Sequence, residues 1–122
     1  MPRVLTDREA DLMEVLREHG PSTVAEVHAR LKADLAYNTV LALLRTMESK
    51  GIVRRSKEGR AHRYVPAIER HKAQKAALKS LARKFFRGST ELLLLHLVSN
   101  EELSADAIAR IQRLLDRQEK NP

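Results

Sequence analysis

The 122-residue chain contains no cysteine. Disulfide bonds, thiolate zinc sites and a thiol nucleophile are therefore excluded, and a metal site would have to use histidines and carboxylates. No apolar stretch approaches the length that spans a membrane, and residues 1–12 lack the apolar core of a signal peptide. We therefore expect a cytoplasmic protein with no membrane insertion.

Catalytic motifs are also missing. The chain has 4 glycines and no glycine-rich loop that would cradle a phosphate, no HExxH pair and no serine in a nucleophile elbow. Its 5 histidines are scattered without the spacing of metal ligands. His96, which lies among leucines, suits a partly buried hydrogen-bonding role or a polar position at a dimer seam, with pH or metal sensing as the alternative. We expect neither an enzyme nor a bound cofactor.

Positive charge is abundant and unevenly distributed. The formal net charge is +7. Residues 67–87 carry 7 basic and 1 acidic side chains, whereas residues 88–122 carry 4 basic and 6 acidic ones. Such a concentration of cations suits nucleic acid, although a basic segment by itself is often a solvated face.

The most informative segment runs from Tyr37 to Pro66, and its first part predicts a helix with two different faces. Apolar side chains recur at the spacing of one buried stripe: Val40, Leu43, Leu44 and Met47. Small or hydrogen-bonding side chains lie on the other face: Asn38, Ala42, Arg45 and Ser49. Such side chains let a helix approach the base edges in a DNA major groove. Gly51 is placed to end this helix in a left-handed cap.

The second part of the segment predicts a β-hairpin with a cationic surface. Five basic residues flank its polar turn: Arg54, Arg55, Lys57, Arg60 and Arg63. Cations in this arrangement neutralise phosphates, and an arginine can also enter a minor groove. Charged hairpins occur as ordinary surface too, so the position directly after the helix is what indicates a DNA-binding wing.

Two capping-box patterns, Thr6 with Glu9 and Thr23 with Glu26, predict two helices ahead of this segment. Three helices and a hairpin within about 60 residues describe a helix-turn-helix with a wing. We therefore expect a mainly α protein, with a winged-helix DNA-binding domain over residues 1–66 and a helical dimerisation region over residues 67–122.

The C-terminal region predicts three further helices. The first runs from Ile68 to Phe86, and a basic row lines one side of it: Lys72, Lys75, Lys79 and Arg83. This row is either an added contact to the DNA backbone or a solvated face. A second helix follows from Thr90 to Val98, and Ser104 caps a third.

The helix from Thr90 to Val98 is apolar on every side and must therefore be enclosed. A second copy of the chain would enclose it, which predicts a homodimer; packing onto the N-terminal half is the alternative. The expected interface residues are apolar side chains of the three helices: Phe85, Leu92, Leu94, Leu95, Leu97, Val98, Ile108, Ile111 and Leu115.

These residues resemble the BlaI/MecI penicillinase-repressor family of winged-helix transcription factors over most of the chain. Four segments carry the resemblance: LTDREADLMEVL, TVAEVHARL, AYNTVLALLRTMESKGIVRRSKEGRAHRYVP and NEELS. The resemblance implies a dimeric repressor of double-stranded operator DNA, an inverted repeat with TACA- and TGTA-like half-sites. On the recognition helix it places Tyr37, Asn38, Thr39, Ala42, Arg45 and Thr46, and on the wing Arg60 and Arg63. The alternative is a winged helix that binds protein, or DNA without sequence preference.

The chain departs from the family pattern at several positions. Arg17 stands where a tryptophan is usual, and Asn38 where a threonine or serine is common. Family repressors of β-lactam resistance are inactivated by a membrane metalloprotease system that cuts an asparagine–phenylalanine bond, and the pair that aligns with it here is His96-Leu97. Copper-responsive relatives carry a cysteine-rich tail, which this chain lacks. The resemblance implies relief by proteolysis, but the departure at His96-Leu97 argues against cleavage at that bond. The inducing signal is not indicated by the sequence.

Overall fold

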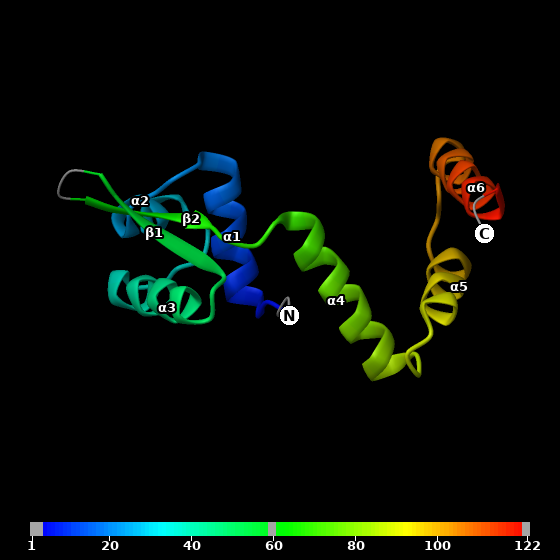
Figure 1. Ribbon diagram of the computed structural model, residues 1–122, viewed down its shortest axis with the longest axis horizontal. Coiled ribbons are helices and arrows are strands. Elements are labelled where there is room, and N and C mark those ends of the chain that lie inside the picture. The colour runs from blue at the N-terminus through cyan, green and yellow to red at the C-terminus, as the bar shows by residue number, and fades with distance from the viewer. Residues whose placement is uncertain (1–3, 59–60, 121–122) are drawn as a thin grey trace. The chain divides into compact units, whose positions relative to one another are not determined.

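The structure is a computed structural model that describes residues 4–58 and 61–120. The fold is mainly helical with one antiparallel hairpin in the described part, as predicted (Figure 1). Its elements are α1 (Asp7–His19), α2 (Val24–Arg30), α3 (Tyr37–Ser49), β1 (Val53–Glu58), β2 (Ala61–Pro66), α4 (Arg70–Phe85), α5 (Thr90–Asn100) and α6 (Ala105–Lys120). The chain forms two compact units, residues 1–80 and 81–122, and α4 contributes to both. The predicted division after Pro66 stays a prediction.

Local interactions begin and end the helices close to the predicted positions. The Thr6 hydroxyl accepts from the Glu9 amide at 3.2 Å, while the Glu9 carboxylate accepts from the Thr6 amide at 2.9 Å. Thr23 and Glu26 make the same reciprocal pair at the start of α2. Gly51 follows Lys50, the C-cap residue of α3, and has a φ of 78°, a left-handed conformation in which a side chain would be strained. Both capping boxes and the glycine cap are therefore confirmed.

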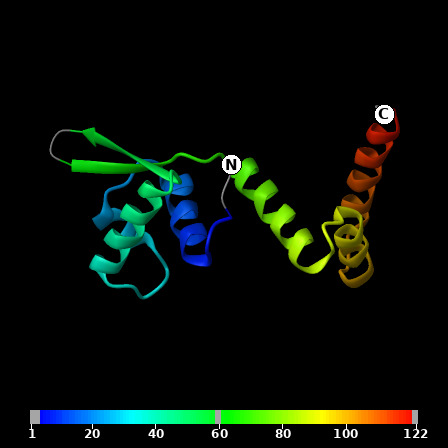
Figure 2. The ribbon, with the colours of Figure 1, turned by 60° about the horizontal axis from the view of Figure 1, so that its bottom comes forward.

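The hairpin is anchored at its base and extends past the helices at its other end (Figures 1 and 2). Val53 pairs with Pro66 and Lys57 with His62 in the antiparallel register. Tyr64 pairs with Arg55 on one side and with Ser22 on the other, where its amide donates to the Ser22 carbonyl at 2.8 Å. Backbone pairing on both sides therefore fixes β2 at Tyr64, whose side chain is buried.

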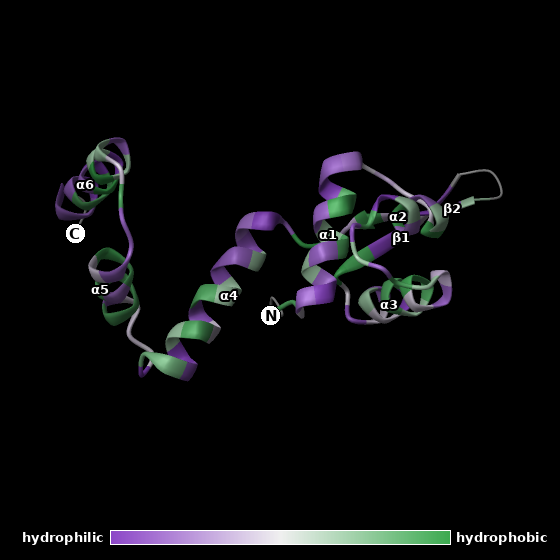
Figure 3. Ribbon diagram, turned by 180° about the vertical axis from the view of Figure 1, so that it is seen from behind, coloured by the Kyte–Doolittle hydropathy of each residue, from purple (hydrophilic) through white to green (hydrophobic). Residues whose placement is uncertain are grey.

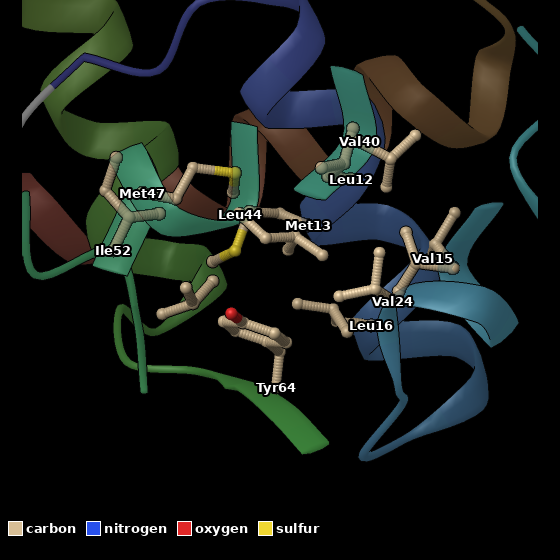
Figure 4. Packing of buried hydrophobic residues seen from close by; sticks show 12 residues of the cluster. Leu12, Met13, Val15, Leu16, Val24, Val40, Leu44, Met47, Ile52 and Tyr64 are labelled. Carbon is tan, nitrogen blue, oxygen red and sulfur yellow. The ribbon is translucent and has the colours of Figure 1, made fainter. Parts of the chain in front are cut away.

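The core of residues 1–80 joins α1, α2, α3 and the hairpin (Figure 4). The predicted stripe of α3 is confirmed at Val40, Leu44 and Met47, which are fully buried, and Leu43 is partly buried. These side chains pack in one cluster with Leu12, Met13, Leu16, Val27, Ile52, Val53 and Tyr64. Each buried side chain of this size stabilises the fold by about 1.5–3 kcal/mol. The cluster holds one face of α3 inward and leaves the opposite face to solvent.

Many residues of the second unit are hydrophobic by type (Figure 3), and most of the large ones are exposed in the single chain. Leu93 of α5 is 7% exposed, whereas Leu95 on the same helix is 53% exposed. Ser104 caps α6 as predicted, since its hydroxyl accepts from the Ala107 amide at 3.1 Å. The helix predicted from Ile68 begins two residues later, at Arg70, and the helix predicted to end at Val98 continues to Asn100. Among the described residues, no helix is both long and apolar enough to cross a membrane.

Candidate nucleic-acid interface

The outward face of α3 is polar and open to solvent. The side chains that the sequence places on this face are all exposed: Asn38, Thr39, Ala42, Arg45, Thr46 and Ser49. None of them takes part in the core cluster. The face therefore presents an amide, three hydroxyls and a guanidinium around one small residue, a set of donors and acceptors suited to base edges and phosphates.

The N-terminus of α3 differs from those of α1 and α2. Ala36 occupies the N-cap position and supplies no side-chain hydrogen bond. The amides of Thr39 and Val40 both donate to the Ala36 carbonyl at 3.1 Å, while the amides of Tyr37 and Asn38 find no acceptor within the described part of the chain. Free amides at the positive end of a helix dipole attract anions. The sequence contains this alanine, but only the observed helix start shows that Ala36 is an N-cap without a side-chain acceptor, unlike the threonines that cap α1 and α2.

Tyr37 lies at the junction of α2 and α3 and is 45% exposed. Its ring contacts His28 edge-on, with ring centroids 5.9 Å apart. The His28 Nε2 lies 2.8 Å from the Leu35 carbonyl oxygen, which accepts a hydrogen bond from it. His28 therefore braces the turn that leads into α3, a role that the sequence analysis did not assign to it.

Two ion pairs connect the hairpin to the helices. Arg55 Nε donates to Glu48 Oε2 of α3 at 2.8 Å. Arg63 pairs with Glu26, the capping-box carboxylate of α2. The amide of Thr23, the largest contribution, and the Arg63 guanidinium both favour the charged carboxylate, so the pKa of Glu26 lies below its ordinary value despite some desolvation. Both arginines hold the hairpin in a fixed relation to the helix-turn-helix.

The predicted wing cations thus divide into two groups. Arg54 and Lys57 are exposed on β1, in the protruding hairpin. Arg55 and Arg63 are engaged in the ion pairs with Glu48 and Glu26. Arg60 lies outside the described residues. The roles predicted for Arg60 and Arg63 in DNA binding stay predictions.

A further ion pair connects α1 to the C-terminal end of α3. Glu9 is 3% exposed, and its Oε2 lies 2.9 Å from Lys50 Nζ at the end of α3. Burial raises the pKa of the Glu9 carboxyl, but hydrogen bonds from the Thr6 amide and from Lys50 outweigh burial, so its pKa is lowered overall. One side chain therefore caps α1 and fastens the C-terminal end of α3.

Arg17 has a structural partner outside its own helix. Its Nη2 donates to the Ile68 carbonyl at 2.8 Å, and its side chain is 13% exposed. The nearby Arg70 Nη2 lies 3.2 Å from Glu14 Oε2. Arg17 therefore forms a contact between α1 and the entry to α4.

The residues predicted for dimerisation are largely exposed in the single chain. Eight of them have 41–74% of their surface exposed: Phe85, Leu92, Leu94, Leu95, Leu97, Val98, Ile108 and Leu115. Ile111 is partly buried. His96 and Leu97 are exposed on α5, and the His96 ring contacts Phe86 edge-on with centroids 5.2 Å apart. In the described residues, no group of three or more histidines and carboxylates is placed to hold a metal ion.

Comparison with known proteins identifies the family. A family model described as penicillinase repressor matches residues 5–117. The chain belongs to the penicillinase repressor family. It is 34% identical to the transcriptional regulator BlaI of Mycobacterium tuberculosis, over 88% of this chain and 83% of that protein. It is 25% identical to the penicillinase repressor of Bacillus licheniformis, over 92% of this chain and 89% of that protein.

A solved structure of another family member extends the comparison. The solution structure of the Bacillus licheniformis BlaI monomeric form, in complex with the blaP half-operator, matches this chain with a TM-score of 0.52 and 26% identity. The match covers 59% of this chain and 93% of the other. The resemblance to the BlaI/MecI family is therefore confirmed by both sequence and structure.

Proposed function

We propose that this protein is a sequence-specific DNA-binding transcriptional repressor that acts as a homodimer on an inverted repeat with TACA- and TGTA-like arms. The observation that carries the proposal is the solvent-facing polar side of α3, which Arg55 and Glu48 couple to a cationic hairpin. In winged-helix proteins, this combination places one helix in the major groove and a β-ribbon along the backbone.

The named relatives support the proposal. One is called a transcriptional regulator, another a penicillinase repressor, and the third was solved bound to a half-operator. That third match spans 93% of the bound protein and 59% of this chain.

We assign base recognition to α3 and backbone contact to the hairpin. Asn38 is exposed in the first turn of α3 and can present its amide to an adenine edge. Arg54 and Lys57 are exposed on β1, and within the described residues neither has an ion-pair or hydrogen-bond partner that would compete with a phosphate. Thr39, Arg45 and Thr46 complete the face, together with the free amides at the start of α3.

The exposed apolar side chains of α5 and α6 support the proposed homodimer. Contiguous apolar surface on this scale marks an association site, and each inverted-repeat arm needs its own recognition helix. We also retain relief by proteolysis, carried out by a membrane metalloprotease system, as a proposal. His96 and Leu97 both lie in α5, so cleavage between them would cut the proposed interface.

Selection of bound sequences from a random duplex pool tests the specificity, at roughly 0.15 M salt so that pure charge attraction is screened. We expect an inverted repeat with TACA-like arms, bound roughly 10³-fold or more tightly than random duplex. Recovery of no motif would replace the proposal with a winged helix that binds DNA without preference or binds protein.

Two single variants test the assignment of roles on the selected duplex. We expect Asn38→Ala to lose mainly the preference over random duplex, by about 1–3 kcal/mol. We expect Lys57→Ala to weaken binding to both duplexes alike. The slope of log K against log salt should become less steep by about one, the contribution of one phosphate contact. Binding isotherms with the reverse pattern would overturn the assignment.

A further inference from the structure

The helix α4 carries cations without any acidic side chain. Its sequence from Arg70 to Phe85 contains six basic residues and neither aspartate nor glutamate: Arg70, Lys72, Lys75, Lys79, Arg83 and Lys84. The helix α6 has the same length but carries three acidic residues among its cations. Acidic residues three or four positions away usually stabilise lysines on a solvated helix face, and like charges at this spacing are unfavourable by about 0.2–0.5 kcal/mol per pair. The helix α4 therefore lacks the ion pairs between successive turns that usually stabilise a solvated helix face.

Lys72, Lys75 and Lys79 form a free row on one side of α4. Their spacing of three and four residues places them on the same face, and all three are exposed. No acidic partner contacts them within the described part of the chain. Leu78, Leu81 and Phe85 lie on the other side and are 40–74% exposed. If the apolar side joins the proposed dimer, the basic row stays open to solvent.

The lysine row belongs to the same compact unit as the proposed interface. Residues 1–80 form one unit, which includes α3, the hairpin and all three lysines. The hydrogen bond from Arg17 to Ile68 and the ion pair between Arg70 and Glu14 attach the beginning of α4 to α1. The lysine row therefore lies on a helix whose beginning is attached to α1, within the same compact unit as α3 and the hairpin.

We propose that Lys72, Lys75 and Lys79 form a second, sequence-independent contact to the phosphates of the DNA that the winged helix binds. The inference rests on the proposed DNA-binding function and adds a binding surface outside the helix-turn-helix and the wing. The three side chains span roughly 10 Å along the helix axis. Since phosphates recur about every 3.4 Å along the axis on each strand, the row spans about three successive phosphates.

The salt dependence of binding tests this contact directly. The triple variant K72Q/K75Q/K79Q removes three charges from exposed positions and leaves the core untouched. The matched control is R110Q/R113Q/R117Q on α6, which removes three charges at the same spacing from exposed positions. Both variants and the wild type are titrated with a duplex of roughly 40 base pairs of random sequence, and with the selected operator in the same length, between 50 and 200 mM salt.

We expect the α4 variant to flatten the plot of log K against log salt by about 2 to 3 per protomer on both duplexes. The advantage of the wild type over this variant should then shrink roughly sixteen- to sixtyfold per protomer between 50 and 200 mM salt. The ratio of operator to random affinity should stay unchanged, because a phosphate contact carries no sequence information. The control variant should keep the wild-type slope to within about one.

Equal slopes for the α4 variant and the wild type would overturn the inference and leave the proposed repressor function intact. Equal flattening by the α6 control would also overturn it, since the effect would then reflect net charge alone. A flattened slope without any preference for the selected duplex would keep the α4 contact and overturn sequence-specific repression. Circular dichroism and sedimentation confirm that each variant keeps its fold and oligomeric state.

Discussion

At the residue scale, Glu9 shows how one side chain serves two distant requirements. It completes the capping box of α1 and binds Lys50, which is 41 positions away in the sequence. The capping box could be predicted, because Thr6 and Glu9 are three residues apart and their pairing is local. The contact with Lys50 could not, because it depends on how α1 and α3 pack. The same distinction applies to Arg63, whose partner Glu26 lies 37 positions away.

The charge of Glu9 should make stability depend on pH. Its folded-state pKa lies below the ordinary value of 4.5, so its stabilising contribution is present above about pH 4.5 and is lost as the pH falls through the lower folded-state pKa. We expect Glu9→Gln, which keeps the capping acceptor, to reduce the free energy of unfolding by about 1–2 kcal/mol at pH 7. The difference from wild type should shrink towards pH 3.

Urea unfolding at pH 7 and pH 3 measures this difference. Asp11→Asn is the matched control, because Asp11 pairs with Arg8 at 3.3 Å in an exposed position. Exposed pairs contribute little, so the control should stay within about 0.5 kcal/mol of the wild type at both values of pH. A constant deficit of Glu9→Gln across this range would contradict a role for the carboxylate charge.

At the element scale, the uncapped N-terminus of α3 suggests a conflict between stability and binding. Asparagine or aspartate at an N-cap typically stabilises a helix by about 1 kcal/mol relative to alanine. We expect Ala36→Asn and Ala36→Asp to raise the melting temperature. We also expect Ala36→Asp to weaken DNA binding at least about fivefold, because a carboxylate close to a phosphate is repelled by about 1 kcal/mol even in water.

Thermal unfolding and binding isotherms of the same preparations test both parts. Ala36→Asn is the matched control, since it fills the same cap without adding charge. DNA binding by Ala36→Asp that equals that of Ala36→Asn would show that no phosphate approaches this end of α3.

The elements themselves were largely predictable from local patterns. The period of Val40, Leu44 and Met47 determined which face of α3 is buried, and Gly51 marked the end of the helix. The start of α4 was less predictable: a helix was expected from Ile68, but the Ile68 carbonyl accepts from Arg17 and the helix begins at Arg70. This long-range hydrogen bond has no signature in the neighbouring sequence.

At the scale of the whole molecule, the exposed leucines of α5 argue for a second copy of the chain. Leu94 is 42% exposed in the single chain. We expect Leu94→Asp to raise the dimer dissociation constant at least roughly a hundredfold, because burying an unpaired carboxylate costs several kcal/mol. Operator binding should weaken accordingly, since a monomer engages one arm of the repeat.

Sedimentation over a range of protein concentrations measures the association. Ser99→Asp places the same charge on the same helix at an exposed polar position and should leave the dimer intact. An unchanged sedimentation coefficient for Leu94→Asp would contradict the proposed interface. The sequence predicts that α5 is apolar on every side. It does not predict what covers the helix, because that depends on contacts with another chain.

The pairing of Tyr64 also has a consequence for engineering. Because Tyr64 is held by Arg55 on one side and Ser22 on the other, the register of the hairpin is set at its base and not by the turn. Residues inserted between Glu58 and Ala61 should lengthen the tip while each strand keeps its buried side chains. The length and charge of the segment between the strands can therefore be varied to change the strength of the proposed backbone contact, while α3 and the core stay as they are.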